Sequence, residues 1–119
     1  MNAAPLDTWE DVEAFALTLP GTERGTTYRM PTVKVAANGR GFVWTSGEPE
    51  TSFAVWLEPG GVEMLMETDR ETFWQSPHYL GSSAVLIRYS SEDPERVRRV
   101  IEQAYEQALA MKPVRPRKK

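Results

Sequence analysis

The stretch AVLIRYSSEDPERVRRVIEQAYEQALAM, residues 84–111, decides the fold class. Its first six residues form an apolar run with β-branched side chains, which is typical of a buried strand. Asp93 then offers an oxygen to cap a helix, and Pro94 suits the first helical position. Apolar residues follow on one helical stripe: Val97, Val100, Ile101, Ala104 and Ala108. A strand followed by a long amphipathic helix that ends near Met111 predicts a domain of mixed α and β structure.

A second helix is predicted near the start of the chain. Thr8 and Asp11 have the spacing of a capping box, in which a hydroxyl and a carboxylate satisfy free backbone N–H groups. Apolar residues at helical spacing follow, and they predict a helix over about residues 9–18. Pro20-Gly21 ends it, because proline restrains the preceding residue and glycine accepts the turn.

The middle of the chain predicts antiparallel strands. Short segments of alternating or apolar residues carry this signal: residues 33–35, 42–44 and 53–57. Asn38-Gly39 lies between the first two and suits a type I′ hairpin, in which both central residues take positive φ. Trp56 alternates with Phe53, so it points to the other face of its strand, toward a second layer or toward solvent.

Two further segments lie between these strands and residues 84–111. Residues 62–68, VEMLMET, are too short for periodicity to decide, but Met, Leu and Glu favour a short helix. Phe73-Trp74 and residues 76–81, SPHYLG, are predicted to form an irregular connection.

The composition excludes several kinds of chemistry. The chain has no cysteine and one histidine, His78, so disulfides, thiolate nucleophiles and cysteine ligands are absent. A zinc ion would need carboxylates for all its other ligands, which zinc rarely accepts, so no metal and no other cofactor is expected. No apolar run approaches the roughly 18 residues of a membrane span. We therefore expect a cytoplasmic protein without membrane contact.

The charge is unevenly distributed. Five of the 14 basic residues lie among the last eight residues, which contain no acid: Lys112, Arg115, Arg117, Lys118 and Lys119. The rest of the chain keeps nine basic and 17 acidic residues, a net charge of −8. We predict a single domain over residues 1–111 and a basic tail over residues 112–119 that is too polar and proline-broken to fold alone.

His78 is the natural candidate for catalysis, but it lacks partners. Ser76, Ser82 and Ser83 lie nearby in sequence, and no Gly-x-Ser-x-Gly elbow surrounds any of them. We expect His78 to order its turn through hydrogen bonds, and we expect no enzymatic activity. Whether His78 and Tyr79 also line a pocket or an interaction surface stays open.

Four tryptophans are many for a chain of this length. Aromatic side chains on a sheet can stack on bases or line a ligand pocket, although most tryptophans belong to the core. Trp44 and Trp56 are expected to be partly exposed, which makes them candidates for recognition.

Three stretches resemble the MmcQ/YjbR-like family, often labelled double-wing DNA-binding proteins: LTLPGTERGTTY (residues 17–28), PTVKVAANGRGF (residues 31–42) and ETDRETFWQSPHYLGSSAVLIRY (residues 67–89). The resemblance implies an α+β two-layer sandwich. In it, a twisted antiparallel sheet of about five strands is packed by the N- and C-terminal helices, as in secretion-chaperone-like folds.

The family label implies DNA as a partner. An acidic body opposes broad docking of a duplex, so only a local basic patch or the tail can serve. The leading hypothesis is weak, sequence-independent binding through Arg29, Lys34, Arg40 and the tail, with the hairpin at Asn38-Gly39 acting as a wing. The alternative hypothesis is a module that binds a protein partner or a small ligand through Trp44 or Trp56. The sequence leaves the oligomeric state open.

Overall fold

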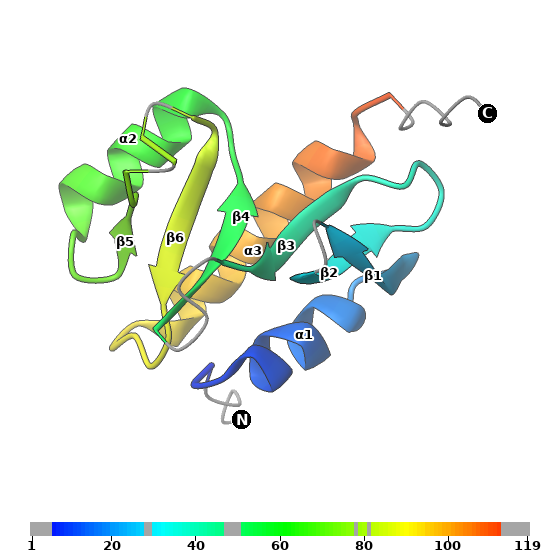
Figure 1. The fold of residues 1–119 in the computed structure, drawn as a ribbon, viewed down its shortest axis with the longest axis horizontal. Helices are drawn as coiled ribbons and strands as arrows, with labels where there is room; N and C mark the ends of the chain where they lie inside the picture. The colour runs from blue at the N-terminus through cyan, green and yellow to red at the C-terminus, as the bar shows by residue number, and fades with distance from the viewer. Residues whose placement is uncertain (1–5, 28–29, 47–50, 78, 81, 113–119) are drawn as a thin grey trace.

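A computed structural model describes residues 6–27, 30–46, 51–77, 79–80 and 82–112 of the chain (Figure 1). The helices in these ranges are α1 (Trp9–Leu17), α2 (Pro59–Thr68) and α3 (Pro94–Leu109). The strands are β1 (Thr22–Thr27), β2 (Met30–Val35), β3 (Gly41–Thr45), β4 (Ser52–Trp56), β5 (Phe73–Trp74) and β6 (Ala84–Arg88). No helix in the described ranges is both long enough and apolar enough to cross a membrane.

The strands form one antiparallel sheet of six strands in the order β1-β2-β3-β4-β6-β5. This confirms the predicted α+β fold, with an antiparallel sheet packed by the terminal helices. The sheet has six strands where about five were expected. Phe73-Trp74 was predicted to be irregular, and that prediction is wrong, because these residues pair with β6 as β5.

Strand β1 has the sequence TERGTT, which contains no large apolar residue, so no alternating pattern marks it. Its pairing with β2 extends over the whole strand. One ion pair lies on each of its faces: Arg24 Nε is 3.2 Å from Glu13 Oε1 on α1, and Lys34 Nζ is 3.8 Å from Glu23 Oε2. Partly exposed pairs of this kind contribute little, so main-chain pairing with β2 holds an edge strand that hydrophobicity alone does not predict.

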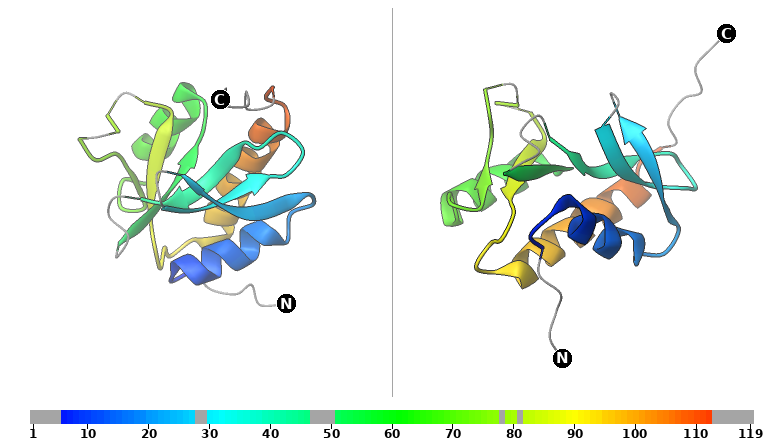
Figure 2. Two further views of the ribbon diagram at one scale, coloured as in Figure 1. Left: turned by 45° about the vertical axis from the view of Figure 1, so that its right-hand side comes forward. Right: turned by 60° about the horizontal axis from the view of Figure 1, so that its bottom comes forward.

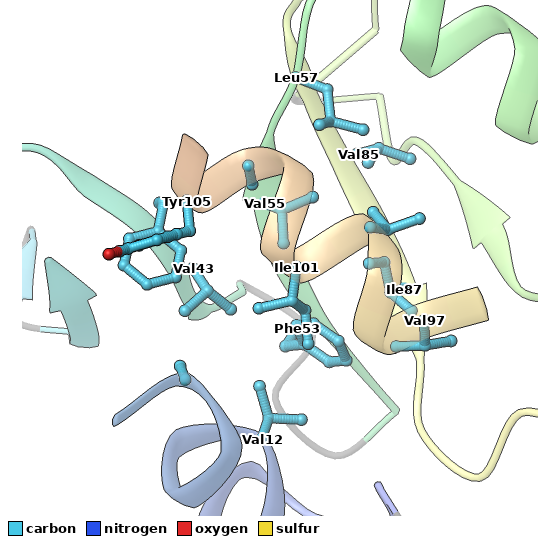
Figure 3. Packing of buried hydrophobic residues seen from close by; sticks show 14 of the residues in the cluster. Val12, Val43, Phe53, Val55, Leu57, Val85, Ile87, Val97, Ile101 and Tyr105 are labelled. Carbon is cyan, nitrogen blue, oxygen red and sulfur yellow. The ribbon is translucent and has the colours of Figure 1, made fainter. Parts of the chain in front are cut away.

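The main core lies on one face of the sheet, and all three helices contribute to it. On α3, the predicted apolar stripe is buried, with Ile101 at its centre. Figure 3 shows Ile101 beside Phe53 of β4, with Val12 of α1 on the opposite side of that ring. Figure 2 (right) shows α1 and α3 running side by side beneath the strands. The other face of the sheet therefore has no helix over it among the described residues.

The predicted helix caps are present. Thr8 Oγ1 accepts a hydrogen bond from the backbone N–H of Asp11 at 3.2 Å, and Asp93 Oδ1 accepts one from that of Arg96 at 3.1 Å. The short helix predicted at residues 62–68 is also confirmed, and it begins three residues earlier, with Pro59 in its first turn.

The turn between β2 and β3 differs from the predicted type I′ hairpin. Gly39 has a φ of +73°, but Asn38 does not have positive φ, so the type I′ geometry is wrong. Asn38 instead uses its side chain: Nδ2 donates to the carbonyl oxygens of Ala108 at 2.8 Å and Met111 at 3.2 Å. The amide thus caps the C-terminal end of α3, where backbone carbonyls lack helical partners. The β2–β3 turn is docked on α3.

Asn38→Ala is expected to lower the free energy of unfolding by about 1–2 kcal/mol, because two acceptors at the end of α3 lose their donor. Urea unfolding followed by circular dichroism measures this. Gln103→Ala removes an exposed amide from α3 and is expected to change stability by less than about 0.5 kcal/mol. Equal stability of Asn38→Ala and the wild type would contradict the capping role.

Candidate nucleic-acid interface

The face of the sheet opposite the helices carries a second, smaller cluster, which we call the helix-free face. A row of register partners crosses it from β2 to β5: Thr32, Trp44, Ala54, Leu86 and Trp74. Trp44, Ala54, Ala84 and Leu86 are buried there, and Met30, Trp74 and Tyr79 pack against them. Large side chains of this face therefore shield it from water in place of a helix.

Trp44 and Trp56 differ in exposure. Trp44 is only 4% exposed, so the prediction that it is partly exposed is wrong. The ring of Trp56 lies over it at 5.2 Å between centroids, and the indole N–H of Trp44 donates to the hydroxyl of Tyr79 at 3.4 Å. Trp56 is 42% exposed, which confirms the prediction for that residue. The exposed ring of Trp56 therefore packs on the buried ring of Trp44.

A third tryptophan lies on the same face beside a cation. The indole N–H of Trp74 donates to Ser52 Oγ at 3.0 Å, and the guanidinium of Arg88 lies 4.7 Å from the centre of its ring. Arg88 also donates to the carbonyl oxygen of Glu71 at 3.1 Å. Arg88 was not among the site residues predicted from the sequence. Its alternation with Ile87 along β6 was the available signal, because it places Arg88 away from the main core.

Lys34 projects from β2 onto the helix-free face, since its neighbours Val33 and Val35 belong to the main core. Its stem crosses Gly25 on β1, where an added Cβ atom would lie 3.0 Å from Lys34 Cε. The ammonium group ends near Glu23, and both side chains are partly exposed. Such a pair in solvent is weak, so Lys34 can exchange Glu23 for another anion at little cost.

Arg40 reaches in another direction. Its Nε donates to the carbonyl oxygen of Lys112 at 2.7 Å, and its backbone N–H donates to Asn38 Oδ1 at 3.0 Å. Lys34 and Arg40 were predicted to flank one wing. Lys34 extends toward β1, whereas Arg40 extends toward the residue that follows the end of α3. The structure joins Arg40 to Lys112, the first residue of the basic tail.

Several predicted site residues lie outside the described residues: Arg29, His78, Arg115, Arg117, Lys118 and Lys119. Tyr79 is described, and it packs against the cluster that contains Trp44. Within the described ranges, no group of three His, Asp or Glu residues is placed to hold a metal ion.

A polar pocket of about 310 Å³ lies where the turns before β5 and after β6 meet. Four acidic residues line much of it, together with Arg88: Asp69, Glu71, Glu92 and Asp93. Tyr89 adjoins this pocket, and burial, reinforced by the carboxylate of Glu10, raises the pKa of Tyr89 to about 12. The acidic lining would repel phosphate groups, so a nucleic-acid interface is better placed at Arg40 or on the helix-free face.

Comparisons with known proteins agree with this architecture. A family model described as YjbR matches residues 17–107, which is more than half of the chain. The fold is similar to the crystal structure of Deinococcus radiodurans protein DR2400, whose domain is described as DUF419. That match has a TM-score of 0.74 at 15% sequence identity and covers 90% of this chain and 82% of the other. None of the curated protein sequences matches this chain.

Proposed function

The chain belongs to the YjbR family, and on that premise we propose that it is a non-enzymatic cytoplasmic protein that binds DNA weakly and without sequence preference. The binding uses contacts to phosphate groups, made by Arg40 and the basic tail that begins at Lys112. The observation that carries the proposal is the hydrogen bond from Arg40 Nε to the carbonyl oxygen of Lys112, at 2.7 Å.

This hydrogen bond holds Lys112, the first residue of the basic tail, beside Arg40. Five basic residues lie within the last eight positions, and Arg40 adds a sixth at the point where the tail begins. Residues 1–111, Arg40 included, have a net charge of −8, so a duplex is repelled from most of the surface and attracted to one end. Contacts of this kind bind any sequence, because they meet phosphates and leave the base edges unread.

The test is a salt titration of duplex DNA binding, with fluorescence anisotropy as the readout. A tail-neutralised variant carries glutamine at Lys112, Arg115, Arg117, Lys118 and Lys119 and keeps the backbone carbonyl that Arg40 contacts. If all five cations meet phosphates, log K falls with log salt about 4 to 5 units more steeply for the wild type than for this variant. Arg40→Gln is expected to reduce the slope by about 1.

Arg70→Gln serves as the matched control, since Arg70 is an exposed cation in the turn between α2 and β5. Figure 1 places this turn at the end of the sheet remote from the β2–β3 turn. The slope of log K against log salt for Arg70→Gln should equal that of the wild type. Absence of duplex binding by the wild type near physiological salt, or an unchanged slope in the tail-neutralised variant, would refute the proposed function.

A further inference from the structure

Acidic residues are absent from every strand of the sheet except β1. The chain has 17 acids, yet strands β2 to β6 contain no Asp or Glu. Their charged residues are Lys34 and Arg88, and both lie on the helix-free face. Glu23 of β1 adds one acid to that face, and it is already ion-paired with Lys34. The strands of an acidic protein thus present a helix-free face without the acidic excess of the whole chain, which leaves this face open to an anionic partner.

Trp56 is the exposed aromatic group on this face. Its ring packs against that of Trp44. Trp44 is itself buried, and its indole N–H donates a hydrogen bond to the hydroxyl of Tyr79. The indole of Trp56 is therefore fixed before any ligand arrives, so binding costs little side-chain entropy. Trp56 is 42% exposed, so part of its ring is available to a planar group.

A second aromatic position lies along the same strands. Trp56 pairs with Ala84 at one end of the β4–β6 ladder, and Ser52, the hydrogen-bond partner of Trp74, pairs with Arg88 at the other end. Four residues of a strand separate Trp56 from Ser52, which corresponds to about 13 Å. The face therefore offers an open ring at one end and a ring with an adjoining cation at the other.

We propose that the helix-free face binds an unpaired nucleic-acid strand, with a base stacked on Trp56 and a phosphate near Lys34. This rests on the proposed function for the choice of nucleic acid as partner, and it adds a second site with its own preference. Every base has a π face, so stacking tolerates any sequence. A duplex hides its bases between neighbouring pairs, so this face selects the unpaired strand.

The test compares wild-type and Trp56→Ala chains for binding to an oligothymidylate of about ten nucleotides. Trp56→Ala is expected to weaken this binding about 5- to 100-fold and to leave duplex binding unchanged. Trp56→Phe keeps a ring and should retain most of the affinity. Met64→Ala removes a 56% exposed apolar side chain from α2 and should bind like the wild type. An oligouridylate of equal length separates DNA from RNA, and stacking on either one supports the proposal.

A measurement on the wild type makes the test independent of how well the variants fold. In NMR spectra, oligothymidylate is expected to shift the indole N–H resonance of Trp56 strongly and that of Trp9, which packs against the main core, very little. An unshifted Trp56 resonance, or equal oligothymidylate affinity of Trp56→Ala and the wild type, would overturn the proposal. A molecular mass that rises with protein concentration in the wild type, but not in Trp56→Ala, would overturn it in favour of a protein partner.

The two proposals fail separately. If the tail-neutralised variant loses duplex binding while Trp56→Ala binds oligothymidylate normally, only the helix-free face is wrongly assigned. If Trp56→Ala loses oligothymidylate binding while the tail-neutralised variant keeps the wild-type salt slope, only the phosphate contacts of the tail are wrongly assigned.

Discussion

Phe53→Ala is expected to lower the free energy of unfolding by about 3–5 kcal/mol, the usual cost of removing a buried aromatic ring. Phe53 is fully buried on β4, and its ring lies 5.5 Å from that of Tyr89. It contributes to the cluster where α1, α3 and the sheet meet (Figure 3). Removal of the ring leaves a cavity, and α1, α3 and the sheet all lose contacts. Because small domains are stable by only about 5–15 kcal/mol, this variant should be close to unfolding.

Urea unfolding, followed by both tryptophan fluorescence and circular dichroism, measures the loss. Met64→Ala, at an exposed position of α2, is the control and should change stability by less than about 0.5 kcal/mol. A loss below about 1 kcal/mol for Phe53→Ala would mean that β4 does not form the centre of the core.

Ala54→Asp is expected to cost about 3–5 kcal/mol, although Ala54 faces away from the helices. Ala54 is fully buried between its register partners Trp44 and Leu86. A carboxylate at this position would be surrounded by apolar side chains with no cation against it. The loss should shrink at acidic pH, where the carboxyl group is protonated and the charge disappears.

The control for this variant is Ala14→Asp, at an exposed position of α1. It should change stability by less than about 1 kcal/mol. A small effect of Ala54→Asp would mean that water already reaches the helix-free face. Trp44 would then not hold Trp56 in place, and the stacking site would lose its support.

The helices could be predicted from sequence because their signals are local. Thr8 and Asp93 supply side-chain caps, and the stripe that contains Ile101 has the period of a helix. Strand β1 could not be predicted, since main-chain pairing with β2 stabilises it in place of apolar alternation. Strand β5 is two residues long, and it forms only through its pairing with β6.

The candidate site was predictable in part. Trp56 followed correctly from alternation along β4, because one strand decides which face a residue takes. Trp44 was expected to be partly exposed, yet Trp56 and Tyr79 contact it, and no local pattern reveals a contact from another strand or turn. The same holds for Asn38, whose two acceptors, at the end of α3 and just beyond it, lie 70 and 73 residues further along the chain.

The most direct test is the salt dependence of oligothymidylate affinity for three proteins: the wild type, Trp56→Ala and the tail-neutralised variant. Stacking on Trp56 involves no counterions, so the log–log line of Trp56→Ala should lie below that of the wild type and parallel to it. The line of the tail-neutralised variant should be shallower, because phosphate contacts release counterions. Lines that coincide for all three proteins would contradict both the stacking site at Trp56 and the phosphate contacts of the tail.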